Sequence, residues 1–498
     1  MWKKMLSVVL AVALLMTGMS LPAFADSGQA TEEDMYTYDI VIYGGNASGI
    51  IAAIQAARMG KTVAVVDPNP YRIGGMTTGG LGDTDVGSAG VIGGLAKEFY
   101  ERINEAYGKN VNHKFEAKVA LQVLEEWVAE YDNIEVFQNE QLNLSDGVEM
   151  DGTKIVSLTT MSGKVFKGDM FLDCSYEGDL MAKANVTYVI GRESNDVYGE
   201  TFNGITGATD MDGLPSGIDP YIVPGDPESG LLPGVNADAG GEVGEGDNRV
   251  QAYNFRWTLT NDSSNRLETE KPENYDVADY ELLLRAIEKG LPASKIFKTA
   301  SANALPGNKV DANNNCGIST DLVGGSYDYP EGDWETRAKI VQAHEDYQKG
   351  LLWTLQNNPR VPENVRNEAK KYGLCNDEFA ENDYWPTQIY VRESRRMVSD
   401  FVVTQHVCRQ NSTVYVEDSI GMGSYSMDSH HIQYIVKDGQ VRAEGDFFAA
   451  TSPYSISYRS IVPKANECTN LLVPVCLSAS HAAYGSIRME PVFMVLGQ

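Results

Sequence analysis

Residues Tyr38–Asp67 read Y-D-I-V-I-Y-G-G-N-A-S-G-I-I-A-A-I-Q-A-A-R-M-G-K-T-V-A-V-V-D and decide how the first part of the chain folds. The apolar run Ile40–Tyr43 predicts a buried parallel strand. A glycine-rich turn follows, and then a helix of small residues over Ala47–Met59 that a glycine, Gly60, ends. A second apolar run, Thr62–Val66, leads directly to an acid. The stretch therefore predicts a complete βαβ unit with a phosphate-binding turn.

The turn has the chemistry that a dinucleotide needs. Glycine lets the backbone approach a pyrophosphate, and a helix N-terminus offers N–H groups and a positive dipole end. Asp67 lies eighteen positions after Gly49 and suits a ribose diol. Asn46 stands where G-x-G-x-x-G has its middle glycine, and since Asn tolerates left-handed backbone we expect the turn to persist with less room. The candidate contacts in this unit are Gly44, Gly45, Asn46, Ala47, Ser48, Gly49, Asp67 and Pro68.

The N-terminus has the pattern of a secretory signal peptide. Basic M-W-K-K precedes the short apolar run Met5–Met16 and an A-x-A site that ends at Ala25. We expect cleavage after Ala25 and a secreted or extracytoplasmic protein. The alternative is a membrane anchor, for which the run is short.

Composition limits the classes of partner and metal site. A net charge of −29 over 498 residues argues against nucleic acid and anionic membranes as partners. The six cysteines contain no C-x-x-C pair, so no zinc or iron–sulfur site is expected. Their disulfide pairing stays open. A small-molecule substrate is the expected partner.

Two later segments extend the expected cofactor site. The stretch Ile73–Gly82 is rich in glycine and suits backbone contact with a flat ligand, although a flexible loop is the alternative. In Met170–Asp179 an apolar strand ends in an acid and a Gly-Asp turn, which favours flavin over nicotinamide; an ordinary strand–helix junction is the alternative. The candidate contacts here are Gly74, Gly75, Met76, Thr77, Thr78, Gly79, Asp173, Glu177, Gly178 and Asp179.

The periodic α/β pattern stops near Val186, and Gly, Asp, Pro and Asn become frequent up to about Asn382. Helical patterns within this part cover Val277–Lys289 and Trp334–Trp353. Because specificity usually resides in loops on a rigid scaffold, we interpret this part as an inserted substrate-side region. The expected domains are the signal peptide 1–25, a cofactor domain over 26–185, an inserted α+β substrate or cap region over 186–400, and a C-terminal part over 401–498 that returns to the cofactor domain.

An arginine group and two histidines are the catalytic candidates. If the chain is helical from Tyr390, then Arg392, Arg395 and Arg396 share one face and form an anion clamp, with Arg392 orienting the substrate. The alternative is a surface helix with salt bridges to Glu393. His430 and His481 are candidates for proton transfer near neutral pH, although a single histidine is more often structural.

The motifs G-G-N-A-S-G-I, G-G-M-T-T-G-G-L-G, Y-E-G-D-L-M-A, V-Q-A-Y-N-F-R, Y-V-R-E-S-R-R-M, D-S-H-H and S-A-S-H-A-A-Y-G-S-I-R-M-E-P occur in this order. Together they resemble the FAD-dependent oxidoreductase family of exported bacterial flavoproteins. The resemblance implies a Rossmann-type FAD-binding domain of the two-dinucleotide-fold type, with FAD held by the first three motifs. It implies hydride transfer between flavin N5 and a small organic substrate, carbohydrate-derived compounds included. The electron acceptor stays unknown.

The end of the chain departs from that family. In relatives Gly497-Gln498 leads into a helix that meets the flavin, which makes Gln498 a further cofactor candidate. We read Val492–Leu496 as a buried strand, expect no helix to supply a dipole there, and interpret the chain as truncated. Two other functions stay open: an NAD-dependent dehydrogenase, and a non-catalytic exported protein that binds a nucleotide or glycan at a degenerate site.

Overall fold

The structure is a computed structural model that describes residues 34–209, 214–292, 296, 304–313 and 316–498. The expected signal peptide at 1–25 lies outside these residues. In the described part of the chain, no helix has the length and apolar character needed to cross a bilayer.

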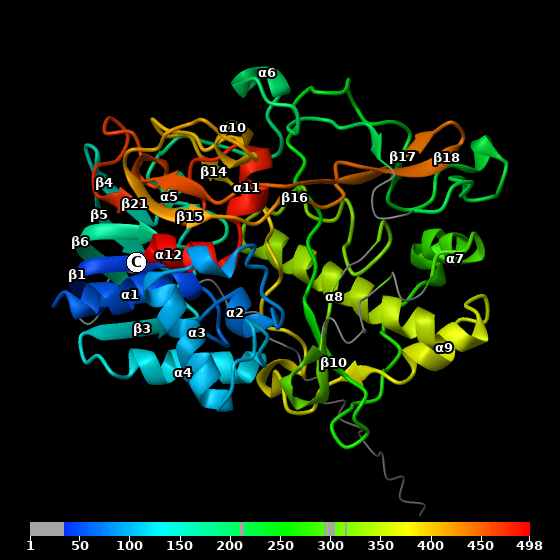
Figure 1. Ribbon diagram of the computed structural model, residues 1–498, viewed down its shortest axis with the longest axis horizontal. Coiled ribbons are helices and arrows are strands. Elements are labelled where there is room, and N and C mark those ends of the chain that lie inside the picture. The colour runs from blue at the N-terminus through cyan, green and yellow to red at the C-terminus, as the bar shows by residue number, and fades with distance from the viewer. Residues whose placement is uncertain (1–33, 210–213, 293–295, 297–303, 314–315) are drawn as a thin grey trace, which may run out of the picture.

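The main sheet holds the predicted βαβ unit (Figure 1). Within the described residues it has seven strands in the order β3-β2-β1-β6-β5-β4, with β21 also paired to β6. The neighbours β3–β2, β2–β1, β1–β6 and β21–β6 are parallel, whereas β5 and β4 add an antiparallel edge. The strands are β1 (Met35–Tyr43), β2 (Val63–Asp67), β3 (Ile134–Gln138), β4 (Val148–Asp151), β5 (Lys154–Thr159), β6 (Val165–Asp173) and β21 (Leu471–Leu472).

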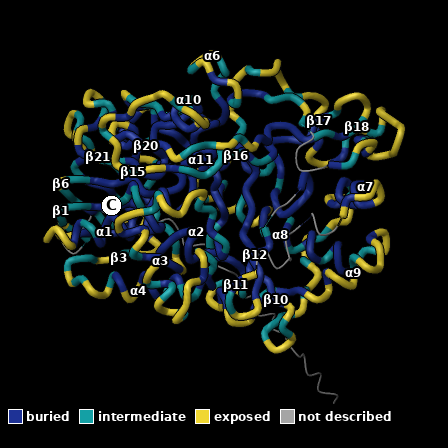
Figure 2. The backbone as a smooth tube through the Cα atoms, in the orientation of Figure 1, coloured by how far each residue is buried: buried dark blue, intermediate teal, exposed yellow. Residues whose placement is uncertain are grey.

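The predicted first unit is confirmed. Helix α1 (Ala47–Arg58) joins β1 to β2, and Gly60 follows it with φ +79°, a value that favours glycine. Almost every residue of α1 is buried, because the helix lies between the sheet and the C-terminal helix α12 (Glu490–Gly497). Figure 2 shows this dark-blue centre beneath a partly exposed outer layer.

Two amphipathic helices cover α1 from outside, as their patterns predict. They are α3 (Gly94–Tyr107) and α4 (Ala117–Val128). Each buries an apolar stripe, which includes Phe99 in α3 and Trp127 in α4, against α1 and its neighbours. These helices keep the glycine turn on a rigid support.

The inserted region forms the other half of the molecule, with the long helix α8 (Trp334–Asn357) crossing it (Figure 1). Asp333 caps α8 by accepting a hydrogen bond from the Thr336 N–H. The second expected helix begins as a 3₁₀ turn, Val277–Tyr280, and continues as α7 (Glu281–Glu288). A small antiparallel sheet contains β11 (Ala304–Leu305), β12 (Lys309–Ala312), β10 (Trp257–Thr260) and β13 (Gly373–Leu374).

The remaining elements are short. The helices are α2 (Met76–Gly79), α5 (Asp179–Lys183), α6 (Asn195–Tyr198), α9 (Glu363–Ala369), α10 (Gln405–Cys408) and α11 (His481–Ile487). The strands are β7 (Tyr188–Val189), β8 (Ala208–Thr209), β9 (Val235–Asn236), β14 (Arg396–Met397), β15 (Ser419–Gly423), β16 (Met427–Ser429), β17 (Gln433–Lys437), β18 (Gln440–Glu444), β19 (Phe447–Ala449) and β20 (Tyr454–Ser457).

The prediction of a helix that carries Arg392, Arg395 and Arg396 is wrong. Residues 391–395 have no regular secondary structure, and Arg396 lies in β14, paired with β7. The side chains have separate partners: Arg392 pairs with Asp321, Arg395 with Asp179 and Arg396 with Glu193. Buried carboxylates from other segments thus outweigh the helical spacing, and the three arginines form no common clamp.

The reading of Val492–Leu496 as a strand is also wrong. These residues lie inside α12, which has Pro491 in its first turn and packs against α1 and α3. A Cβ on Gly497 would collide with the backbone of Ser48, so only glycine permits this close approach.

The first residue of α12 ties three segments together. Glu490 accepts hydrogen bonds from Tyr176 Oη (2.8 Å) and Thr77 Oγ1 (3.2 Å), and Tyr176 in turn accepts one from the Met76 N–H (2.9 Å). Burial raises the pKa of Glu490 to about 7, against the two hydrogen bonds that lower it. The tether therefore contains a carboxyl group that titrates near neutral pH.

This titration predicts a pH-dependent stability. Since the folded pKa of Glu490 is raised, its contribution is fully present below the unfolded value and is lost as pH rises through about 7. Glu490→Gln keeps an acceptor but cannot ionise. In thermal denaturation of FAD-free protein, wild type should match the variant near pH 4 and become less stable than it by about 2–3 kcal/mol above pH 8. Glu125→Gln, at an exposed position of α4, is the control. Parallel curves for wild type and Glu490→Gln would contradict the assignment.

Candidate functional site

The glycine turn faces a cavity of about 390 Å³ at the carboxyl ends of β1, β2 and β6. Ligands commonly bind at this edge of an open parallel sheet. Of the predicted cofactor residues, those that line it are Gly44, Asn46, Asp67, Pro68, Gly75 and Glu177. The others do not line it, and Gly74 joins the two glycine segments by a 2.6 Å hydrogen bond from its N–H to the Gly45 carbonyl.

Asp67 is placed as the sequence predicts, at the end of β2 with its side chain against the turn. A Cβ on Gly45 would lie 2.5 Å from Asp67 Oδ2, so glycine is needed for this approach. Burial raises the pKa of Asp67 to about 7, although the backbone N–H groups of Asn69 and Gly45 act in the opposite direction. A hydroxyl donor from a ribose would give this carboxyl group a further hydrogen bond.

Asn46 keeps the turn in a way that the sequence does not suggest. Its φ is −70°, so the expected left-handed backbone is wrong at this position, while Gly44 does take φ +99°. The Asn46 side chain caps α1 by accepting from the Gly49 N–H (3.1 Å) and donates to the Cys174 carbonyl. The substitution therefore ties the turn to the end of β6.

The inserted region supplies the opposite wall of the cavity, which sequence reasoning did not predict. Trp334, Arg337 and Val341 come from α8, and residues 385–389 complete the wall. The buried Trp385 Nε1 and Thr387 Oγ1 have no hydrogen-bond partner among the described residues. A ligand with acceptor atoms could satisfy both, so the donor set fits a dinucleotide cofactor. The available signal was the density of aromatic residues in Y-W-P-T-Q, at positions 384–388.

Two of the predicted cofactor contacts in the Gly-Asp turn after β6, Asp173 and Asp179, have different structural roles. Asp173 accepts hydrogen bonds from Ser175 and the Met181 N–H, and so shapes the turn itself. The Asp179 carboxylate is buried between Arg337 (2.6 and 2.8 Å) and Arg395 (2.7 Å). Burial alone would raise its pKa, but the two guanidinium groups outweigh this and lower it. Asp179 thus anchors the inserted region to the cofactor unit.

The second glycine segment and the last residue have structural partners as well. Thr78 donates to the Ile73 carbonyl inside the short helix α2, and Gly79 approaches Gln388 so closely that a Cβ would lie 2.5 Å from its side chain. The Gln498 side chain accepts a 2.6 Å hydrogen bond from the Leu95 N–H at the start of α3. It lines a separate apolar groove and not the cofactor cavity.

A cluster of charged and polar side chains, which we call the charged chamber, lies next to the cofactor cavity and contains Asp321, Tyr390, Arg392, Asp428, His430 and Arg488. Residue Asn254 pairs with Tyr390 through a 2.8 Å backbone hydrogen bond, while the neighbouring Phe255 and Ile389 line the cavity. The Asn254–Tyr390 pair therefore places the chamber next to the cofactor cavity. Gln348 of α8 holds the neighbouring Phe255 by bonding both its N–H (2.6 Å) and its carbonyl (3.0 Å).

His430 stands in this chamber beside two carboxylates. Its Nδ1 lies 2.6 Å from Asp321 Oδ2, and its Nε2 lies 3.7 Å from Asp428 Oδ2. Burial and the charge of Arg392 lower the pKa of His430, against the carboxylates. Burial would raise the pKa of Asp321, but Arg392 and His430 hold it at about 2. An imidazole that burial and Arg392 keep neutral, and whose Nδ1–H is donated to Asp321, can accept a proton at Nε2.

Two arginines of the chamber face the same tyrosine ring. The guanidinium of Arg392 lies 5.0 Å and that of Arg488 5.5 Å from the Tyr390 ring centroid. Each also has a carboxylate, Asp321 at 2.9 Å and Asp428 at 2.9 Å. Since both charges are matched within the protein, the chamber offers polar groups without a net positive site.

His481 occupies a different position from His430. It begins α11, is buried, and lies 2.8 Å from Glu393, which Arg396 also contacts at 3.1 Å. Gln251 links the two histidines: its amide nitrogen donates to Glu393 (3.1 Å) and its oxygen accepts from the His430 N–H (3.2 Å). Only His430 of the pair has measurable side-chain exposure, 13% against 1%.

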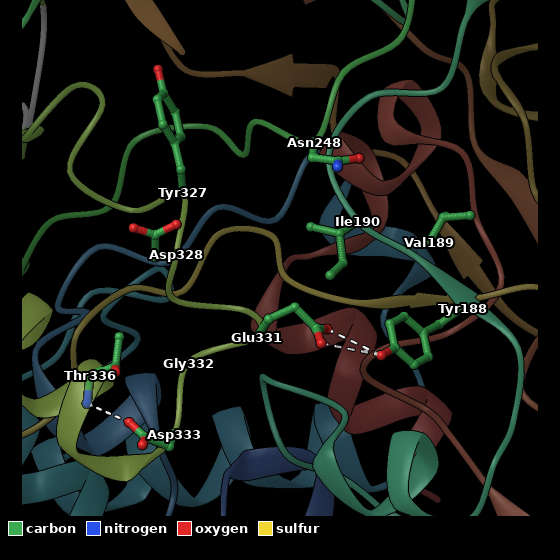
Figure 3. A pocket seen from close by; sticks show the side chains of 10 residues that line it. All are labelled: Tyr188, Val189, Ile190, Asn248, Tyr327, Asp328, Glu331, Gly332, Asp333 and Thr336. Carbon is green, nitrogen blue, oxygen red and sulfur yellow. Dashed lines mark hydrogen bonds between the residues drawn. The ribbon is translucent and has the colours of Figure 1, made fainter.

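A larger cleft of about 850 Å³ opens outside the cofactor cavity, between β7 and the segment that precedes α8 (Figure 3). Tyr188 Oη donates to Glu331 Oε1 at 3.2 Å across it, and Asp333 caps α8. Asp328, Glu331 and Asp333 make it acidic. Neither glycine segment lines this cleft, so we do not assign it to the cofactor although its volume exceeds that of the cofactor cavity.

Two further observations concern the cysteines and the possible metal ligands. The six cysteines lie within the described ranges, are buried, and form no disulfide. No group of three potential metal ligands occurs among the residues that the structure describes.

Comparisons with known proteins place the chain in a family. Curated protein sequences gave no match. Among solved structures, similar chains include OxyS anhydrotetracycline hydroxylase from Streptomyces rimosus (TM-score 0.25, 14% identity, 32% of this chain and 36% of that chain). Others are GidA from Aquifex aeolicus (0.23, 17%, 32% and 34%) and thioredoxin reductase from T. acidophilum (0.19, 16%, 28% and 34%). The chain thus spans about a third of the length of these structures.

The sequence as a whole gives a clearer result. Residues 39–498 match the model of the family described as FAD dependent oxidoreductase. The match begins at the βαβ unit and includes the inserted region, the charged chamber and α12. The chain therefore belongs to the FAD-dependent oxidoreductase family, and FAD is its cofactor.

Proposed function

We propose that this oxidoreductase moves a hydride between a carbon atom of a small organic substrate and FAD, with His430 exchanging the accompanying proton. The observation that carries the proposal is the 2.6 Å pair of His430 with Asp321, in the chamber next to the cofactor cavity. Asp321 holds the proton on Nδ1, which directs the lone pair of Nε2 to a reacting hydroxyl.

The residues that would hold FAD follow from the cavity. Asp67 would bind the ribose hydroxyls, and the turn Gly44–Gly49 with the start of α1 would bind the pyrophosphate. Gly75 would let the flavin approach the second glycine segment. FAD, when bound, supplies the acceptor or donor of two electrons.

The proton step balances in either direction. When the substrate is an alcohol, His430 Nε2 would accept its O–H proton as the C=O bond forms, and bound FAD would supply the two-electron acceptor for the hydride of the C–H bond. Arg488 and Tyr390, joined by a 2.9 Å hydrogen bond, would orient the substrate oxygen. The pairing of both arginines with carboxylates favours a neutral, oxygen-rich substrate such as a carbohydrate-derived compound over an anion.

Replacing Asp67 tests the cofactor assignment. Asp67→Ala should weaken FAD binding about 10-fold to 100-fold, because a pair of hydrogen bonds to a charged group contributes about 1.5–3 kcal/mol. FAD retained after dialysis is measured by absorbance, and circular dichroism checks the fold. Asp169→Ala, at an exposed position of β6, is the control. Equal retention by all three proteins would remove Asp67 from the ribose site.

Replacing His430 tests the proton transfer. Sugars, hydroxy acids and unsaturated acids are first screened anaerobically for bleaching of the bound flavin. With a reducing substrate, His430→Gln should slow bleaching about 10²-fold to 10⁴-fold while FAD stays bound. His406→Gln, whose ring Nε2 lies 3.0 Å from the Gly199 carbonyl, away from the chamber, is the control.

The pH profile gives a second readout of the same step. Because the pKa of His430 is lowered, its neutral form should dominate above about pH 6.5, and the rate of alcohol oxidation should fall only at lower pH. Parent-like bleaching by His430→Gln, with an unchanged profile, would place the proton acceptor elsewhere. His481→Gln should leave this profile in place, since His481 lies outside the chamber.

A further inference from the structure

A second cavity, of about 360 Å³, lies across α8 from the cofactor cavity. Helix residues Ala343, Asp346 and Tyr347 line it, whereas Ala338, Val341 and Glu345 of the same helix line the cofactor cavity. The two spaces are therefore separate. The described residues around the second one come from α7, α8, β17 and the segment that ends at Val323.

Stacked tyrosines form much of its wall. The ring of Tyr280 lies 5.3 Å from Tyr275 and 5.9 Å from Tyr347, with interplanar angles of 15° and 9°. The hydroxyl groups have partners within the protein: Tyr280 donates to the Tyr347 carbonyl (2.9 Å), and Tyr347 to the Ser319 carbonyl (2.8 Å). Because Tyr280 stacks on both neighbours, a ligand would contact the ring edges and the outer face of Tyr347.

The same cavity is negatively charged. Asp279 and Asp346 stand nearer its mouth, and the buried Asp321 lies at its floor. Burial and the neighbouring Asp276 raise the pKa of Asp279, as expected where carboxylates crowd together. None of the described lining residues is Lys, Arg or His. Just outside, the ammonium group of Lys271 lies 5.3 Å from the Tyr275 ring, which shows that the stack attracts a cation.

We propose that this cavity binds a small organic cation, an amine or quaternary ammonium compound with apolar substituents. The tyrosine stack would contact the apolar groups and the charge together, and Asp279 and Asp346 would supply the counter-charge. Its volume suits a ligand of a few carbon atoms and lies at the lower end of that of ordinary ligand sites. The site is distinct from the hydride-transfer chamber, although Asp321 borders both.

Calorimetric titration of the FAD-loaded full chain tests the proposal with two probes of nearly equal shape. Choline carries the positive charge, and 3,3-dimethylbutan-1-ol is its neutral analogue. Choline should bind about tenfold more tightly, because the charge alone gains the interaction with π surfaces and carboxylates. Measuring in about 0.15 M salt suppresses weak binding to the acidic surface. No substrate is present, so the result does not depend on the role of His430.

Two variants locate the binding. Asp346→Asn should weaken choline binding about tenfold and leave the neutral alcohol unchanged. Asp146→Asn, at an exposed position far along the sequence beside β4, should bind choline as the parent does. The proposal is overturned if neither probe binds, if both bind equally, or if Asp346→Asn behaves as Asp146→Asn does. Preferential binding of glucose, titrated as a third probe, would show a polyol site instead.

Discussion

The carboxylate of Asp179 is the group on which the arrangement of the two halves depends. It is fully buried, and Arg337 of α8 and Arg395 hold it with three hydrogen bonds. A carboxylate taken out of water is costly unless its charge is matched, and removing one partner of such a group leaves that cost uncompensated. The inserted region therefore has one orientation on the FAD-binding unit. That orientation closes the cofactor cavity, because the same α8 that carries Arg337 carries Trp334 and Val341.

A similar rule separates the two histidines. Both have a carboxylate on Nδ1 and both connect to Gln251, so their local chemistry is alike. His481 is enclosed by the start of α11, Glu393 and the Phe447 ring, 5.8 Å away. His430 retains some exposure beside Tyr390 and Asp428. Burial, which composition does not encode, is the reason that we propose His430 and not His481 for the proton exchange.

The sequence was sufficient where local pattern and tertiary structure agree. The βαβ unit, α3, α4 and the core of α8 follow from apolar spacing and stop signals, and Asp67 takes its place because β2 ends there. The sequence was insufficient where residues far apart in the chain determine the local backbone structure. The arginines at i, i+3 and i+4 suggest a helix, yet Asp321, Asp179 and Glu193 draw them into an extended path. The error at Val492–Leu496 was avoidable, because Glu490-Pro491 is a common start of a helix.

The cofactor cavity and the chamber could be predicted only in part for the same reason. A glycine turn can be recognised in the sequence, because the close approach of Gly45 to Asp67 excludes any other residue at position 45. The facing wall comes from residues 334–345 and 385–389, whose aromatic and polar side chains follow no fixed spacing from the turn. Asp321 and His430 are 109 positions apart, so no motif joins them.

The tether between Thr77 and Glu490 has a consequence for the order of events during synthesis. Its two ends are separated by 413 positions, and β21 likewise joins the first sheet late. Contacts so distant in sequence form slowly and only after most of the polypeptide has left the ribosome. The nascent chain thus exposes the apolar surface of β1 and α1 for most of its elongation. We expect it to rely on a holding chaperone, and to acquire its flavin only after release.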